Sequence, residues 1–282
     1  MLFRSVFFSS FDPEELERIW RAIKSIRPRL VQAHPSTMFH LAHLVETRQD
    51  TEKAFEIFES SGEQLDRKQR DAIARSLGCM VINRYGLAEA GVVAYQTDPR
   101  NLAMLVFDPF CWPEIAAVDG IDETPPHEHA TGGELVVSTI RNRMMPLIRY
   151  RTGDLAVLGE TSQGFIIHDM IGRTHDVIEL AGRKIPTHYL QDALNRIGGV
   201  RTFQIEIDQG RPLLRIVREA NGNPDRIRTR LAGWWGTGVD VQFIDSSELK
   251  LQGRRAKFRY VVGASANAPI NAAMQRDPVP GP

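Results

Sequence analysis

Three segments near the start of the chain repeat apolar side chains at helical spacing and are bounded by residues that begin or end helices. The first follows Asp12, whose side chain suits an N-cap, and ends before Pro28. Its apolar face consists of Leu16, Ile19, Trp20, Ile23 and Ile26. The same spacing predicts a second helix over residues 37–45 and a third that follows Asp66 and ends before Gly78.

Short apolar runs that favour strands follow these helices. They cover residues 80–83, 92–95, 102–107, 133–140, 145–150, 155–158 and 165–168. Polar turns separate the runs between residues 133 and 158, which predicts adjacent strands. Because helices alternate with strands in a chain of 282 residues, we expect an α/β fold with one large or two smaller domains.

The sequence pattern changes after residue 164. A polar cluster at residues 172–176 suits a connection between domains. Beyond it the patterns predict a strand at 177–180, a helix over 190–197, a hairpin joining 203–207 to 213–217, a helix from 223 and a strand at 239–243. We therefore expect a large domain over residues 1–171, a small α+β domain over 172–262 and a disordered tail over 263–282, which is rich in Ala, Asn, Pro and Gly.

Composition excludes several classes of protein. The chain has 35 Lys and Arg against 35 Asp and Glu, with no long basic run, which argues against binding to nucleic acid or to an anionic membrane surface. No apolar stretch approaches the roughly 20 residues of a membrane span. The two cysteines, Cys79 and Cys111, cannot form a disulfide framework or a zinc site by themselves. We expect a cytoplasmic protein.

Two segments of the first domain combine a glycine with a carboxylate. Residues 83–89, Asn-Arg-Tyr-Gly-Leu-Ala-Glu, place Glu89 beyond a buried run, where it could hold Mg²⁺ beside nucleotide phosphates. Residues 147–154 lead through Arg-Thr-Gly to Asp154, a carboxylate that could accept hydrogen bonds from both hydroxyls of a ribose. Taken singly, the first segment is typical of a strand–turn–helix junction with a solvated glutamate, and the second is typical of an ordinary hairpin turn.

Two further segments bring cations to the small domain. Gly-Arg-Thr-His-Asp at 172–176, with Gly-Arg-Lys-Ile-Pro at 182–186, combines a joint with positive charge, as expected where a small domain moves over a phosphate-bearing ligand. Residues 253–260 carry Lys257, which could neutralise charge at a phosphorus centre. A solvated linker and a solvated basic surface are the structural alternatives.

In their order and spacing these four segments resemble the motifs of the acyl-adenylate-forming superfamily, and most closely its phenylacetate-CoA ligase branch, with relatives in capsular polysaccharide biosynthesis. Supporting segments are Ser-Gly-Glu-Gln-Leu at 61–65, Gly-Glu-Leu-Val-Val at 133–137 and Phe-Gln-Ile at 203–205. The resemblance runs from about residue 27 to 262. It implies the C-terminal part of a large AMP-binding domain with mixed sheets and helices, followed by a small α+β domain.

The resemblance also implies an activity and residue roles. Family members convert a carboxylic acid and ATP to an acyl-adenylate, then transfer the acyl group to coenzyme A. On this chain, Lys257 would be the adenylation lysine and Glu89 would hold Mg²⁺. Asp154 would bind the ribose with help from Arg173, and Gly182 would begin the loop of the thioester half-reaction. The adenine and acyl pocket would be lined by Gly62, Glu63, Asn83, Tyr85 and Gly86.

The sequence departs from the family pattern in three places. No Ser/Thr/Gly-rich phosphate loop precedes these motifs, so the chain resembles the C-terminal part of a longer ligase, whose open domain edge would favour a partner chain or self-association. Ala88 stands where relatives have a threonine, and His175 stands where they have an acidic hinge residue. Apolar residues suited to an acyl pocket, or simply to the core, are Met38, Phe39, Val92 and Val93.

Three functions therefore remain open. The first is a ligase that joins an aromatic or other small carboxylic acid to coenzyme A, using ATP and Mg²⁺. The second is an adenylating enzyme that loads a carrier protein. The third is a catalytically silent protein that binds a nucleotide or serves as an interaction module.

Overall fold

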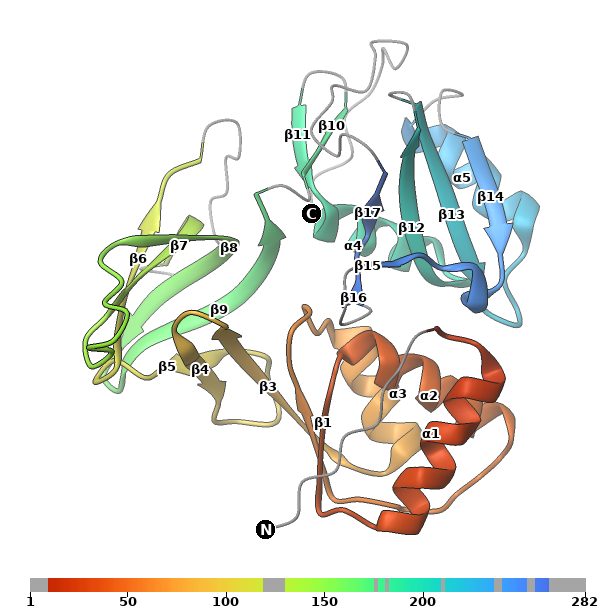
Figure 1. The fold of residues 1–282 in the computed structure, drawn as a ribbon. Coiled ribbons are helices and arrows are strands. Elements are labelled where there is room, and N and C mark those ends of the chain that lie inside the picture. Colours follow the sequence, from red (N-terminus) through yellow and green to blue (C-terminus); the bar gives the residue numbers. More distant parts are fainter. Residues whose placement is uncertain are drawn as a thin grey trace. The chain divides into compact units, whose positions relative to one another are not determined.

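The computed structural model describes residues 10–118, 130–174, 177–180, 183–208, 211–235, 240–252 and 257–263. The chain divides into two compact units, whose elements are drawn in Figure 1. The first unit comprises residues 1–117, 123–170 and 251–258, and the second comprises 118–122, 171–250 and 259–282. In this division residues 251–258, which the sequence assigned to the small domain, lie with the first unit.

The three predicted helices form, and their predicted caps are present. They are α1 (Pro13–Ile26), α2 (Pro35–Thr47) and α3 (Arg67–Leu77). The Asp12 carboxylate accepts a hydrogen bond from the Glu14 N–H at 2.8 Å. Asp66 caps α3 by accepting from the Gln69 N–H at 2.7 Å, and Gly78 ends this helix with a φ of 62°. The two carboxylates satisfy backbone N–H groups that a helix N-terminus leaves without a partner.

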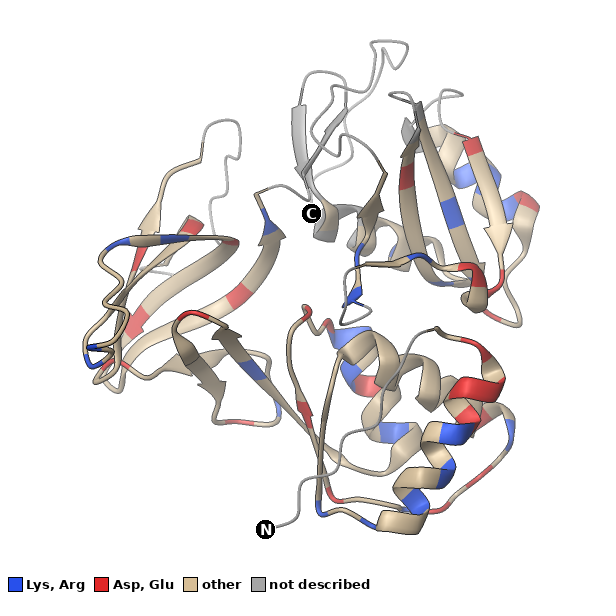
Figure 2. Ribbon diagram, viewed as in Figure 1, with Lys and Arg blue, Asp and Glu red and all other residues tan. Residues whose placement is uncertain are grey.

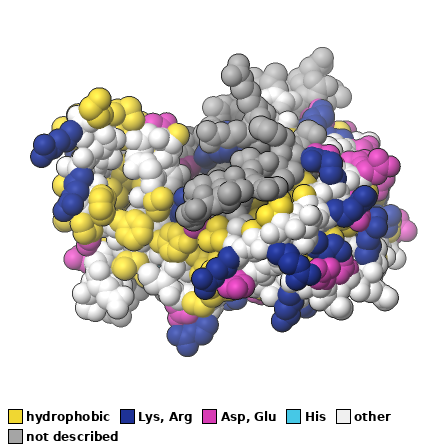
Figure 3. Space-filling model, turned by 60° about the horizontal axis from the view of Figure 1, so that its bottom comes forward, with side chains coloured by type: hydrophobic (Ala, Val, Ile, Leu, Met, Phe, Trp, Pro, Cys, Tyr) yellow, Lys and Arg dark blue, Asp and Glu magenta, His cyan; other side chains and the backbone are white. Residues whose placement is uncertain are grey.

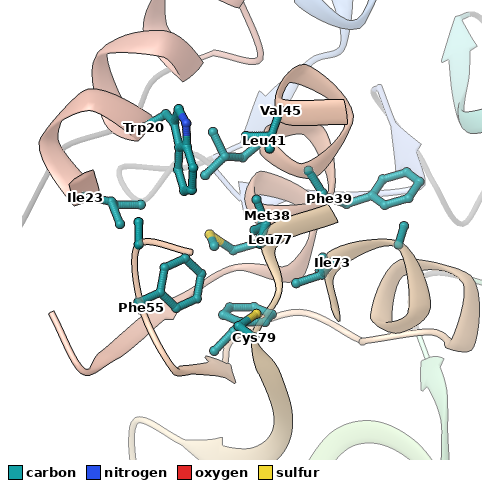
Figure 4. Packing of buried hydrophobic residues seen from close by; sticks show 14 of the residues in the cluster. Trp20, Ile23, Met38, Phe39, Leu41, Val45, Phe55, Ile73, Leu77 and Cys79 are labelled. Carbon is teal, nitrogen blue, oxygen red and sulfur yellow. The ribbon is translucent and has the colours of Figure 1, made fainter. Parts of the chain in front are cut away.

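The helices pack around an apolar core, shown in Figure 4. Trp20 and Ile23 come from α1, Leu41 from α2 and Ile73 from α3, and Leu41 and Ile73 are completely buried. Met38 and Phe39, predicted either for an acyl pocket or for the core, belong to this cluster. Burial raises the pKa of the Cys79 thiol to about 12.

A nine-stranded sheet completes the first unit, with the order β1-β2-β3-β4-β5-β9-β8-β7-β6. β1, β2 and β3 are parallel, whereas the resolved pairings among the later strands are antiparallel. The strands are β1 (Leu30–Ala33), β2 (Ile57–Ser60), β3 (Met80–Leu87), β4 (Gly91–Gln96), β5 (Met104–Val106), β6 (Cys111–Ala116), β7 (Thr131–Thr139), β8 (Tyr150–Thr161) and β9 (Gly164–Arg173).

One predicted strand is wrong. Residues 145–149, all within the described part of the chain, form no strand, and β8 begins only at Tyr150. Pro146 has no N–H to donate to a neighbouring strand, and Arg149 adopts a positive φ of 49°. The Ile148 side chain, expected inside a strand, is 82% exposed.

The second unit has a small sheet with the order β14-β13-β12-β17 and helices α4 and α5. The predicted hairpin is confirmed, because β12 and β13 pair antiparallel with Phe203 opposite Ile216. The elements of the second unit are β10 (Val177–Leu180), β11 (Arg183–Pro186), α4 (Thr187–Ile197), β12 (Val200–Asp208), β13 (Arg211–Arg218), α5 (Pro224–Trp235), β14 (Asp240–Ile244), a 3-10 turn (Ser246–Glu248) and β17 (Val261–Val262). Two short strands, β15 (Leu251–Gln252) and β16 (Lys257–Phe258), pair with each other and belong to the first unit.

The described residues expose charges of both signs, and a group of exposed apolar side chains lies on β6 and its neighbouring loops. Figure 2 shows positive and negative residues interspersed on the helices of the first unit. Figure 3 shows hydrophobic side chains gathered over the part of the first unit that carries β5 to β9. The exposed apolar residues of β6 and its neighbouring loops are Phe107, Phe110, Trp112, Ile140, Met144, Met145 and Ile148. In the described residues no helix has the length and apolar character needed to cross a membrane.

Candidate functional site

The turn after β2 brings Lys257 beside Gly62. Gly62 adopts a φ of +83°, a conformation that residues with a Cβ rarely adopt. A Cβ at this position would lie 3.2 Å from the His34 ring and 3.7 Å from the Lys257 Nζ. The absence of a side chain at Gly62 therefore leaves room for an imidazole and an ammonium group side by side.

Glu63 fastens two segments around this turn. Its Oε1 accepts a hydrogen bond from the Phe258 N–H at 2.8 Å, and its Oε2 accepts one from the Ser36 N–H at 3.3 Å. The Glu63 side chain is 9% exposed, and its Oε1 lies 3.5 Å from the His34 Nδ1. The buried Phe258 ring, 6.2 Å from the Phe11 ring, adds an apolar contact to the same strand. Glu63 thus ties β16, which carries Lys257, to the start of α2.

Burial raises the pKa of Glu63 to about 7, against the opposing effects of hydrogen bonds from Ser36 and Phe258 and of the Lys257 charge. A carboxyl group with this pKa is partly protonated near neutral pH. Glu63 therefore neutralises the Lys257 ammonium less than an ordinary carboxylate would, because its average negative charge is smaller.

A second group of predicted residues meets at Asp154. The Tyr85 hydroxyl on β3 donates to the Asp154 Oδ2 on β8 at 2.8 Å. Asn83, also on β3, is buried, and its N–H donates to the Gln96 Oε1 at 2.6 Å. The β3–β4 register shifts between Tyr85 and Gly86, where a Cβ on Gly86 would meet the Gly91 carbonyl at 2.8 Å.

Residues 151–154 lie near the start of β8, which begins at Tyr150, and are not the hairpin turn that the sequence left open as an alternative. The Glu134 side chain on β7 accepts from the Gly153 N–H at 3.1 Å and forms an ion pair with Arg151. Thr152 donates from its hydroxyl to the Leu135 carbonyl at 2.7 Å and accepts from the Asp154 N–H at 3.1 Å. These bonds replace regular pairing where the β7–β8 register shifts, and they fix the backbone that presents Asp154.

The remaining predicted residues are distributed differently. Glu89 is exposed in the turn between β3 and β4, next to the exposed Ala88. Among the described residues no group of three His, Cys, Asp or Glu side chains could hold a metal ion by itself. Arg173 ends β9 in the second unit, so its convergence with Asp154 on one ligand stays a prediction. Gly182 and His175 lie outside the described residues.

The sequence did not predict the contacts of two buried side chains, the carboxylate of Glu134 and the amide of Gln96. The sequence motifs assign no contact to Glu134 or Gln96, although both side chains are buried. Gln96 also donates to the Asp98 carbonyl at 2.8 Å. A polar residue inside an apolar strand pattern was the available signal, because buried polar groups need hydrogen-bond partners.

Comparisons of sequence place the chain near two curated proteins, whereas no family model matches. The phenylacetate-coenzyme A ligase of Escherichia coli (strain K12) is 23% identical over 278 residues, covering 89% of this chain and 62% of that protein. The phenylacetate-coenzyme A ligase of Pseudomonas putida is 25% identical over 248 residues, covering 84% and 52%. The chain thus spans about half to three fifths of the length of these relatives.

Solved structures share the fold of the chain. A 2-hydroxyisobutyryl-CoA ligase in complex with 2-HIB-AMP superposes with a TM-score of 0.70 at 19% identity, covering 90% of this chain and 58% of that one. An anthranilate CoA ligase in complex with anthranoyl-AMP gives 0.59 at 14% identity, covering 88% and 51%. ATP-bound MatB from Rhodopseudomonas palustris gives 0.56 at 16% identity, with the same coverage.

The predicted α/β fold is confirmed by these likenesses. The shared fold, the order of the sequence motifs and the similarity to two phenylacetate-CoA ligases together support a relationship between this chain and the acyl-adenylate-forming, AMP-binding superfamily of ligases.

Proposed function

We propose that the chain serves in an ATP-dependent ligase that joins a carboxylic acid, aromatic or otherwise small, to coenzyme A through an acyl-adenylate. The observation that carries this proposal is the position of Lys257 beside Gly62, on a strand that Glu63 fastens. The strand that carries Lys257 is bonded through the neighbouring Phe258 N–H to Glu63, 195 residues away in sequence, which a solvated basic loop would not require.

In the proposed first half-reaction a carboxylate oxygen of the substrate attacks the α-phosphorus of ATP. The new P–O bond forms as the bond to pyrophosphate breaks. Lys257 would bind the substrate carboxylate and the α-phosphate and offset the negative charge that gathers between them. The partly neutral Glu63 leaves more of the Lys257 charge for this purpose.

Asp154 would bind the ribose hydroxyls, and Tyr85 would hold the carboxylate in position through the bond at 2.8 Å. Asn83, Gly62 and Gly86 would line the adenine and acyl pocket in this proposal. Arg173 would assist from the second unit.

Glu89 fits the role of a magnesium ligand because it offers a carboxylate from an exposed turn, and Mg²⁺ is usually held by one or two carboxylates together with substrate phosphates. The ion would supply positive charge to the phosphates. In the second half-reaction the thiol of coenzyme A would attack the acyl carbonyl and release AMP, with Gly182 beginning the loop that faces this step.

The test is exchange of labelled pyrophosphate into ATP in the presence of aromatic and aliphatic acids. Lys257→Ala is expected to lower the exchange rate on the order of a hundredfold or more, as for removal of a preorganised charge-stabilising group. Lys24→Ala is the control, because its ammonium pairs with Asp50 and Glu52, neither of which belongs to the proposed site. Equal exchange by wild type and Lys257→Ala would remove the proposed role. Product analysis with coenzyme A and with a phosphopantetheinyl carrier protein then separates the two acceptors.

Binding without turnover is a second candidate function. It is favoured by Ala88, which has no hydroxyl for a phosphate. Calorimetry with a non-hydrolysable acyl-AMP mimic tests it, with Asp154→Asn as the matched variant. Binding of the mimic by the wild type alone, without pyrophosphate exchange, supports this candidate.

We further infer that the apolar surface around Trp112 and Ile148 is covered by a second copy of this chain. These side chains are 50% and 82% exposed, and Met144, in the same loop as Ile148, is 97% exposed. Sedimentation velocity is expected to show concentration-dependent association that Met144→Ser/Ile148→Ser reduces. A wild-type chain that stays monomeric at high concentration would argue against self-association.

A further inference from the structure

Gln204 on β12 is completely buried and binds three backbone groups. Its Nε2 donates to the carbonyls of Lys250 and Arg259, each at 2.9 Å. Its Oε1 accepts from the Lys250 N–H, also at 2.9 Å. One side-chain amide therefore uses both donors and its acceptor on two residues of the same unit.

Those two residues flank the segment that carries Lys257. The segment, residues 251–258, contains β15 and β16, in which Leu251 pairs with Phe258 and Gln252 with Lys257. Gln204 thus joins the backbone just before β15 to the backbone just after β16. Lys257 lies two residues from the Arg259 carbonyl that Gln204 holds.

The face of β12 that carries Gln204 is polar, although the opposite face is apolar. Phe203, Ile205 and Ile207 alternate with Gln204 and Glu206, and they pack in the core of the second unit. Gln204 lies opposite Arg215 on β13, and Glu206 forms ion pairs with Arg215 and Lys250. A buried amide is costly unless it is hydrogen-bonded, so an apolar residue would serve a purely packing role better.

We propose that Gln204 is a positioning residue for Lys257. Its hydrogen bonds hold the backbone of Lys250 and Arg259, at the two ends of the segment 251–258, and thereby restrict the position of the strand that carries Lys257. This inference deepens the proposed function, since the need to position Lys257 rests on its role in adenylation. The clamp itself is a structural property that can be measured without any activity.

Hydrogen exchange of the full chain, followed by mass spectrometry, tests the clamp. Gln204→Leu removes all three bonds at similar volume, and Gln204→Glu keeps only the acceptor for the Lys250 N–H. Both variants are expected to raise exchange in peptides covering residues 250–260 on the order of tenfold or more, with Gln204→Leu the larger. Exchange in β13 and β14 should stay at the wild-type rate.

Ile216→Val is the matched control, because it weakens the core of the same sheet without touching the segment. Its exchange is expected to rise in β12 and β13 and not selectively at 250–260. If Gln204→Leu does not fold, Gln204→Glu decides. Unchanged exchange at 250–260 in a folded Gln204 variant, or a rise spread evenly over the second unit, overturns the clamp.

A catalytic measurement then tests positioning. Acyl-AMP formation is expected to fall about tenfold in Gln204→Leu, with thioester formation from supplied acyl-AMP nearly unchanged. Equal loss in both half-reactions, or no loss despite faster local exchange, overturns the positioning role. If the wild type forms no adenylate with any acid, the proposed function fails, whereas the exchange experiment still decides whether Gln204 clamps the segment.

Discussion

The Tyr85 hydroxyl and the Asp154 carboxylate lie 2.8 Å apart, although β4, β5 and β9 stand between their strands in the sheet order. Four strand spacings would separate the two strands by about 19 Å in a flat sheet. The sheet of the first unit therefore curls, as its strands do in Figure 1, and the hydrogen bond joins the two sides of the curl. The register shift at Gly86 and the irregular start of β8 both lie at this junction.

Tyr85→Phe is expected to lower the free energy of unfolding by about 1.5 to 3 kcal/mol, because a buried carboxylate loses a donor. The affinity for an acyl-AMP mimic should fall as well. Tyr95→Phe is the matched control, since its hydroxyl donates to Glu59 at 2.6 Å in the same unit. Urea unfolding and calorimetry distinguish them: the control should lose stability and retain affinity. If both variants bound the acyl-AMP mimic with equal affinity, Tyr85 would have no role in ligand binding.

Glu63→Gln is expected to change how stability depends on pH. The pKa of Glu63 is raised to about 7 from an ordinary 4.5, so the folded state binds this proton more tightly than the unfolded state. The free energy of unfolding therefore falls as the pH rises from about 4.5 to about 7, by about 3 kcal/mol from this group. Glutamine does not titrate, so the variant lacks this part of the decrease. Urea unfolding at pH 4.5, 6 and 8 measures the difference between the two proteins. Parallel pH profiles would mean that the carboxyl titrates normally.

Gly86→Ala is expected to lower the free energy of unfolding by about 1 to 3 kcal/mol, because the new Cβ would meet the Gly91 carbonyl at 2.8 Å. The control is Gly233→Ala, at an exposed position of α5 where nothing lies within 4 Å of the new Cβ. Helix propensity predicts that this control gains about 0.5 to 1 kcal/mol. Thermal unfolding of both variants gives the comparison. A stabilised Gly86→Ala protein would show that the β3–β4 junction adapts readily.

Asp66→Ala is expected to lower the free energy of unfolding by about 1 kcal/mol, because α3 loses the acceptor for the Gln69 N–H and with it the capping box. Asp71→Ala, on the exposed side of the same helix, removes a carboxylate without removing a cap. Its effect should stay within about 0.5 kcal/mol. Urea denaturation measures both, and a similar loss in the two variants would assign the effect to charge.

Local signals explain which elements were predictable. The caps of α1 and α3 and the alternation of β12 and β13 lie within a few residues of the elements they define. β1 and β2 were missed because each has only four residues and pairs in parallel through intervening helices, so no hairpin turn marks them. The apolar letters of residues 145–150 favoured a strand, whereas Pro146 and the positive φ of Arg149 prevented one.

The residue types of the site were predictable, but most of its contacts were not. Tyr85 and Asp154 are 69 residues apart, and their bond depends on the curl of a nine-stranded sheet. Glu63 was expected to line a pocket, and its carboxyl group accepts hydrogen bonds from the backbone of Ser36, 27 residues away, and of Phe258, 195 residues away. Such contacts follow from the tertiary fold, which no spacing within a short motif encodes.

The membership of residues 251–258 in the first unit means that the chain leaves that unit near residue 170 and returns to it eighty residues later. A protein truncated at residue 170 would keep Glu63 but lose the Phe258 N–H that its carboxyl accepts from. The buried acid would then lose a hydrogen bond and the nearby ammonium together. The two units are interleaved along the polypeptide, so cutting this protein into two halves would remove Lys257 and Phe258 from Glu63.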